Sequence, residues 1–244
     1  ANGVILITTK KGTGQDNRLA IELNSGIEFE NVVRLPERQK LYGGGYNITF
    51  DTANINGKEY NIVDYASDES WGPKLDGTSV LHWYNLDPEY ATDYLNPEPW
   101  VYPKNDVQHF FGTGISNTNN ISLSKSNNNS AFRVSFTNKN VTGTVPNSSL
   151  SKNSLSISGS VTGKLLSFFA NANYLKTTTK GRPWTGASNR NIILEAFQWG
   201  MVQIDYKKLK EYKRSDGTPR AWNRTGYRNT VADEKTKYID NPYW

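Results

Sequence analysis

The residues with the clearest capacity for chemistry are four acids that lie close together in the sequence: Asp64, Asp68, Glu69 and Asp76. Carboxylate oxygens are preferred ligands of Ca²⁺, so this cluster is a candidate calcium site. Its spacing does not match the helix-loop-helix calcium pattern, and the alternative is a solvated set of acids that braces a loop. We therefore predict no cofactor, with a structural Ca²⁺ as the open alternative and no firm metal site.

Catalytic side chains of other kinds are scarce. The chain has two histidines, His82 and His109, and no cysteine, which excludes a thiol nucleophile and a thiolate metal site. Neither histidine lies in a recognised motif, and we expect His82 to pack within a loop. A glycoside hydrolase would need two carboxylates in a buried cleft, which nothing in the sequence indicates. The sequence therefore predicts a protein that is not an enzyme.

Five tryptophans are the candidates for contact with a ligand or a partner protein, and all fall in the two predicted long loops: Trp71, Trp83, Trp100, Trp184 and Trp222. An indole ring offers a flat apolar face with one polar edge, which suits sugar stacking or the anchoring of another protein. The alternative is that these rings pin the loops to each other, because a loop of about 80 residues needs a core of its own to stay ordered.

The composition points to a folded but unusually polar chain. Hydrophobic residues are 36% of the 244 and mean hydropathy is −0.68, which is low for a packed soluble domain. Aromatic residues reach 12%, too many for a disordered chain. The net charge of +5 comes from scattered lysines and arginines interspersed with acids, so we do not expect nucleic acid as a partner.

Alternation of apolar and polar residues predicts about five β-strands. The first has Leu19, Ile21, Leu23, Ile27 and Phe29 on one face. Four further stretches repeat the pattern: residues 117–125, 131–137, 154–161 and 166–174.

The connections between these strands alternate in length. Long loops are expected at about 31–115 and 178–244, tight turns at 126–129 and 162–164, and a link of about a dozen residues around Pro146. Short turns at one end and long loops at the other are typical of a transmembrane β-barrel. No apolar run reaches the roughly 18 residues of a membrane helix, so any crossing must use strands. Five strands cannot close a barrel, so more strands must follow.

One short amphipathic helix is expected in the last loop. Ile193, Phe197, Met201 and Ile204 recur at helical spacing, and five basic residues follow between 207 and 214. Its apolar stripe would pack on neighbouring loops or, alternatively, dock a partner.

Several motifs resemble those of the SusC/RagA-like, TonB-linked outer-membrane transporters. Residues 1–12 (ANGVILITTKKG) resemble the final strand of the plug domain, and they start in a strand without an initiator Met, as in a fragment. Residues 68–77 (DESWGPKLDG) look like the acidic, tryptophan-containing motif after the first barrel strand, which is the most specific match. Further similar segments are FFGTG at 110–114, NNISLS at 119–124, GTVPN at 143–147 and NPYW at 241–244.

This resemblance implies a fold, a role and a location. Residues 1–14 would be the end of the plug, and residues 15–244 the first part of a large antiparallel transmembrane β-barrel with long extracellular loops, an all-β fold. The implied function is TonB-dependent import of an oligomeric nutrient, a glycan or a peptide, across the Gram-negative outer membrane. The implied partners are a SusD-like surface lipoprotein, the TonB complex through residues outside this chain, and outer-membrane lipid. The alternative is a secreted β-rich carbohydrate-binding or adhesin module.

Overall fold

A computed structural model describes residues 3, 17–187, 191–224 and 239–244 of the chain. Most of the regular structure is antiparallel β-sheet, which confirms the all-β prediction at that level. The chain divides into two compact units. The sheet unit comprises residues up to 31 and 113–182, and the loop unit comprises 32–112 and 183–244. The predicted plug strand, residues 1–14, lies outside the described residues apart from Gly3.

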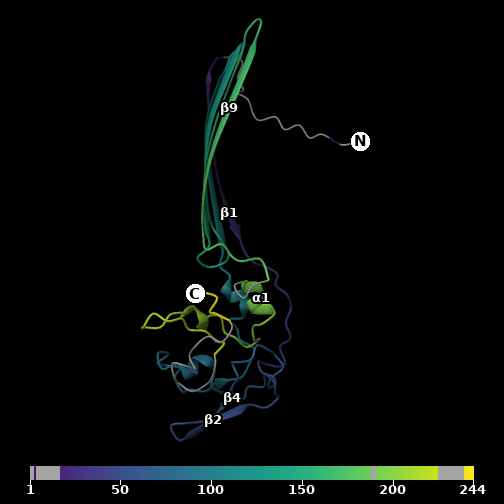
Figure 1. The fold of residues 1–244 in the computed structure, drawn as a ribbon, viewed down its shortest axis with the longest axis vertical. Coiled ribbons are helices and arrows are strands. Elements are labelled where there is room, and N and C mark those ends of the chain that lie inside the picture. Colours follow the sequence, from purple (N-terminus) through teal and green to yellow (C-terminus); the bar gives the residue numbers. More distant parts are fainter. Residues whose placement is uncertain (1–2, 4–16, 188–190, 225–238) are drawn as a thin grey trace. The chain divides into compact units, whose positions relative to one another are not determined.

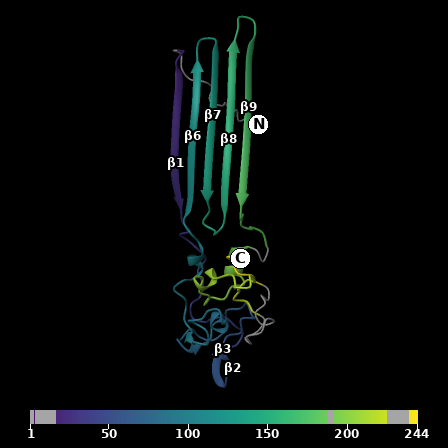
Figure 2. The same cartoon turned by 90° about the vertical axis from the view of Figure 1, so that its left-hand side faces the viewer.

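The sheet unit is a five-stranded antiparallel meander. Its strands run in the order β1-β6-β7-β8-β9, and Figure 2 shows them side by side with neighbours pointing in opposite directions. The strands are β1 (Leu19–Glu30), β6 (Gly114–Ser126), β7 (Ser130–Thr142), β8 (Ser149–Thr162) and β9 (Ser167–Lys180). All five predicted strands are therefore present and in the expected sequence order. Within the described residues β1 pairs only with β6, and β9 only with β8.

The long connections all leave from one end of this sheet. Glu30 pairs with Gly114, so the connection from 31 to 113 starts and finishes at that end. Ser149 pairs with Lys180, so the chain leaves β9 at the same end. The turns at 127–129 and 163–166 lie at the opposite end, beside Leu19. Short and long connections therefore alternate along the chain as predicted, and they lie at opposite ends of one sheet.

The strands are longer than the apolar pattern indicated. Each of β7, β8 and β9 extends by several residues of mostly Asn, Ser, Thr and Lys toward the end with the long connections. The link around Pro146 was expected to have about a dozen residues, and this was wrong, since only residues 143–148 separate β7 from β8. Polar strand ends carry no apolar alternation, so periodicity could not detect them.

The loop unit contains small sheets and short helices instead of bare loops (Figure 1). Two antiparallel strand pairs are the hairpin of β2 (Asp51–Ile55) with β3 (Lys58–Ile62), and β4 (Ser79–Val80) with β5 (Glu98–Pro99). Short 3₁₀ helices are η1 (Trp83–Leu86), η2 (Val107–Phe110) and η3 (Lys208–Lys210).

The predicted helix exists but is shorter than its spacing suggested. It is α1 (Ile192–Phe197), which begins at the cap Asn191, whose side chain accepts a hydrogen bond from the Ile193 N–H at 3.0 Å. Met201 and Ile204 lie beyond its end, so extending the helix through them was wrong. Both are buried at about 1–2% exposure in the core of the loop unit, so their apolar spacing reflects packing and not one helix face.

Buried charges brace the loop unit. Arg220 donates from Nε to Asp87 Oδ2 at 3.0 Å and from Nη2 to Glu89 at 2.6 Å, while Arg214 Nε lies 3.3 Å from the same Asp87 oxygen. The C-terminal residues join this core through Asn241, whose amide donates to the carbonyls of Leu209 and Arg220. The loop unit therefore has its own buried core, which ion pairs and hydrogen bonds stabilise.

Candidate functional site

One face of the five-stranded sheet is apolar over part of its length. Because side chains alternate between faces and the strands are in register, the sheet presents cross-strand rows. Two adjacent rows are almost wholly apolar: Ile21, Leu123, Val134, Ile157 and Ala172, then Leu23, Ile121, Phe136, Leu155 and Tyr174. We call these rows, with Leu19, Phe132, Val161 and Phe168 toward the tight turns, the apolar band. Leu23 is 74% exposed in it.

The apolar band ends at a row of amides. The next row toward the long connections is Ser25, Asn119, Asn138, Asn153 and Lys176. Its members bond to each other, with Ser25 Oγ donating to Asn119 at 2.7 Å and Asn138 Nδ2 donating to Asn153 at 2.8 Å. The face thus changes from hydrocarbon to hydrogen-bonding groups between one row and the next.

The opposite face is mostly polar, with Val141, Leu150, Phe169 and Leu175 as its larger apolar residues. Its central row is Glu22, Ser122, Ser135, Ser156 and Asn173. Glu22 accepts a hydrogen bond from Ser122 at 3.2 Å and pairs with Arg133 at 3.3 Å. Small hydroxyl side chains and a charged pair mark a face suited to water, not to a packed apolar layer.

The five candidate tryptophans divide into two groups. Trp83, Trp100 and Trp222 are buried in the loop unit, at 3% exposure or less, where the loop-packing alternative places them. Trp100 donates from its ring nitrogen to the Pro73 carbonyl at 3.0 Å. Trp71 and Trp184 are exposed by more than half, so of the five candidates these two present a ring face that a ligand can reach.

Trp71 lies in a groove on the loop unit together with an aromatic residue that the sequence did not single out. The groove has a volume of about 350 Å³ and is lined by residues 37–39, 68–71, 197–200 and Val202. We call it the Trp groove. Its two indoles are Trp71, 69% exposed, and Trp199, 42% exposed. Trp199 lies just beyond the end of α1. The sequence predicts that this segment is helical, so it does not predict that Trp199 lies beside Trp71.

The backbone around Trp71 is held in place. The Trp71 N–H donates to the Gly45 carbonyl at 3.1 Å, and the Gly72 N–H donates to the Gly43 carbonyl at 2.9 Å. The Ser70 hydroxyl accepts from the Val202 N–H at 3.2 Å and so ties this segment to the one that carries Trp199. Hydrogen bonds therefore hold the backbone of the segment that carries the exposed Trp71 ring.

Charges in the Trp groove are mostly negative. Glu69 accepts hydrogen bonds from the Tyr46 hydroxyl and from the Asp68 N–H; although desolvation raises its pKa, these bonds leave that pKa below its ordinary value. Arg38 is the one cation in the described lining, and burial lowers its pKa. Its guanidinium donates to the Gly200 carbonyl and lies 5.7 Å from the centre of the Phe197 ring.

The four acids of the candidate calcium site are not gathered into one. Asp68 and Glu69 line the Trp groove, whereas Asp64 lines a different pocket. Asp76 accepts from the Thr78 N–H and hydroxyl, which lowers its pKa and closes a local turn. Among the described residues no group of three histidine, cysteine or acidic side chains is placed to hold a metal ion.

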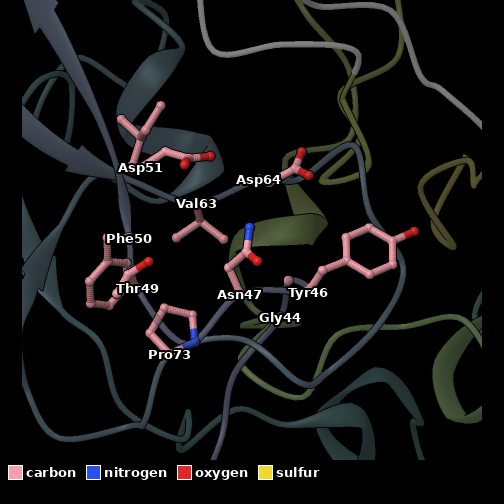
Figure 3. A pocket seen from close by; sticks show the side chains of 11 residues that line it. Gly44, Tyr46, Asn47, Thr49, Phe50, Asp51, Val63, Asp64 and Pro73 are labelled. Atoms are coloured by element: carbon pink, nitrogen blue, oxygen red, sulfur yellow. The ribbon is translucent and has the colours of Figure 1, made fainter.

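The pocket beside Asp64 is small (Figure 3). It is lined by Gly44, Tyr46, Asn47 and Asp51, among others, and the Tyr46 ring lies to one side with its hydroxyl pointing away. Its volume of about 40 Å³ accommodates water molecules. It is too narrow to serve as a site for a sugar or a peptide.

The two histidines occupy contrasting places. His82 is buried and stacks on Tyr84 at 5.4 Å between ring centres, and its Nδ1 lies 3.2 Å from the Tyr65 hydroxyl. Burial lowers its pKa to about 4, so its ring is neutral at physiological pH. This is the packing role expected from the sequence. His109 is exposed in η2.

Comparison with models of known protein families gave no match to this chain, and comparison with curated proteins gave none. Among the helices of the described residues, none is both long and apolar enough to cross a membrane.

Proposed function

We propose that this chain is part of an outer-membrane β-barrel transporter that imports an oligomeric nutrient, a glycan or a peptide. The observation that carries the proposal is the apolar band on one face of the sheet, backed by a polar face along the same strands. Strands of a membrane barrel alternate in this way, with the apolar side toward lipid and the polar side toward a wet interior. A soluble sheet would leave the band exposed to water, which is unfavourable over so large an area.

The height of the apolar band supports the same proposal. It runs from Phe168 to Tyr174 along β9, which at about 3.4 Å per residue is about 20 Å. Barrel strands tilt by about 35–45°, so this length corresponds to about 15 Å of membrane depth, which fits within the apolar belt of about 25 Å in outer-membrane barrels. The amide row at Ser25 would then mark the outer boundary of the hydrocarbon.

The connections support an orientation. In such barrels the short turns face the periplasm and the long loops face outward. The loop unit would therefore stand on the outside of the cell, where a SusD-like lipoprotein could cover it. The edges of β1 and β9, which pair with no further strand among the described residues, would join additional strands, since open edges in lipid are costly. TonB would act through parts of the protein outside this chain.

Fractionation tests this function. The protein that carries this chain should sediment with outer membranes, require detergent for extraction, and migrate faster on a gel when unheated than when boiled. A surface lipoprotein should copurify with it. A monomer that stays soluble without detergent contradicts the proposal and favours the secreted carbohydrate-binding or adhesin module instead.

A further inference from the structure

The Trp groove combines exposed aromatic faces with carboxylates, and we propose that it binds a neutral oligosaccharide. This inference deepens the proposed function, on which it rests, by naming a substrate class and a binding site. Its volume of about 350 Å³ lies at the lower end of the range of about 300–1,000 Å³ for ligand sites, so it takes a short stretch of an oligomer.

The two indoles supply the apolar contact. A pyranose ring has one face of C–H groups, and a flat aromatic ring with a large apolar area is its natural counterpart. The Trp71 backbone is fixed by its own bond to Gly45 and by that of the next residue, Gly72, to Gly43, and the Trp199 N–H donates to the Leu194 carbonyl at 3.2 Å. Rings held on rigid backbone lose little freedom when a ligand binds, which favours affinity.

The polar groups select a neutral ligand. Glu37, Asp68 and Glu69 contribute three carboxylates to the lining, against the single guanidinium of Arg38. Carboxylates accept strong hydrogen bonds from sugar hydroxyls. Arg38 is already engaged by Gly200 and Phe197, so it is poorly placed to neutralise an acidic sugar. Like charges facing each other disfavour binding, so uronates and sulfated glycans are excluded.

Calorimetry on the detergent-purified protein that carries this chain tests the proposal. The neutral probes are malto-, cello-, xylo- and mannooligosaccharides, the acidic probe is oligogalacturonate, and the cationic probe is pentalysine. We expect at least one neutral probe to bind, and Trp71→Ala or Trp199→Ala to weaken it about tenfold, a difference of about 1.4 kcal/mol. Trp184→Ala, which removes an exposed ring outside the groove, should leave the affinity unchanged.

A charge reversal provides a second test that does not depend on removing a ring. Glu37→Lys changes an exposed side chain, so the fold should be retained. It should increase the affinity for oligogalacturonate severalfold relative to the affinity for the neutral probe.

Three outcomes would overturn the inference. The unaltered protein could bind no neutral probe, or it could bind oligogalacturonate or pentalysine more tightly than any neutral probe. The third is that neither Trp71→Ala nor Trp199→Ala changes the affinity for the neutral probe. If the protein is heat-modifiable yet binds no neutral sugar in the groove, the groove assignment fails and the transport function stands. If it is soluble and still binds through Trp71, the transport function fails and the sugar site stands.

Discussion

Gly72 lies so close to Gly44 that a Cβ added at Gly72 would stand 1.9 Å from the Gly44 carbonyl oxygen. Because the obstacle is backbone, it cannot swing aside as a side chain would. The contact joins the segment that carries Trp71, which lines the Trp groove, to the glycine run at 43–45. Two glycines far apart in sequence thereby set the position of an exposed tryptophan.

Gly72→Ala should therefore destabilise the loop unit, by about 1–3 kcal/mol or more, the cost of overpacking. All seven tryptophans of the chain lie in this unit, so urea unfolding followed by tryptophan fluorescence reports on it. Gly186→Ala is the matched control, because a Cβ there meets nothing within 4 Å. Equal midpoints for the two variants would show that the close approach is not rigid.

The pairing of Asp87 with two arginines predicts a second loss of stability. Asp87→Asn would leave Arg214 and Arg220 buried with one carboxylate fewer, and removing one partner of a buried pair costs about 3–5 kcal/mol. The same fluorescence assay measures it. Asp64→Asn, at an exposed acid, should change stability little; a loss as large as that of Asp87→Asn would argue against the buried network as the cause.

Glu195 should make the loop unit less stable as the pH rises. Burial, together with the charge of Asp240, raises the pKa of Glu195 from 4.5 to about 7. Between these values the unfolded chain has lost a proton that the folded chain keeps, so stability falls from about pH 4.5 to 7 and then levels. In Glu195→Gln this component of the pH dependence should vanish.

Melting temperatures of the unaltered protein and of Glu195→Gln between pH 5 and 8 measure the effect. The two curves should diverge as the pH rises, with Glu195→Gln the more stable near pH 8. Glu37→Gln, at an exposed acid, should follow the unaltered protein. Parallel curves for all three proteins would mean that Glu195 is ionised in the folded state.

The two faces of β9 offer a test of lipid contact by neighbouring residues. Ala172 belongs to the apolar band and Asn173 to the polar face. Arginine at the centre of a lipid-facing band costs about 2–4 kcal/mol, whereas a wet interior tolerates it. Ala172→Arg should thus lower the yield of heat-modifiable protein in outer membranes, and Asn173→Arg should not. Equal yields for the two variants would contradict the claim that the face of Ala172 contacts lipid and the face of Asn173 contacts water.

The sequence predicted the sheet better than the loops, for a physical reason. Ile21, Leu23 and their partners alternate strictly because each strand has one apolar face, and this pattern is visible without a structure. Strand ends around Lys139 and Lys152 are polar on both faces and gave no such signal. The β2–β3 hairpin had a readable sign in Asn56-Gly57, both with positive φ, the dipeptide preferred in tight hairpin turns.

The candidate site was only partly predictable. Trp71 was a candidate because of its motif, but nothing in the local sequence shows that Trp71 is exposed whereas Trp100 is buried. Burial in the loop unit depends on contacts between distant segments, such as Gly44 with Gly72. Trp199 reaches the groove only because α1 ends at Phe197, and helix ends are among the features that spacing alone defines least well.

The most direct measurement of the central claim is cysteine labelling on intact cells, since this chain contains no cysteine of its own. Asn128→Cys and Lys164→Cys lie in the tight turns, and Asn96→Cys and Lys104→Cys lie in the loop unit. A membrane-impermeant maleimide should label the two loop variants on whole cells and the two turn variants only after lysis. Labelling of turns and loops alike on intact cells, or of the turns alone, would contradict a sheet that crosses the outer membrane with its long connections outside.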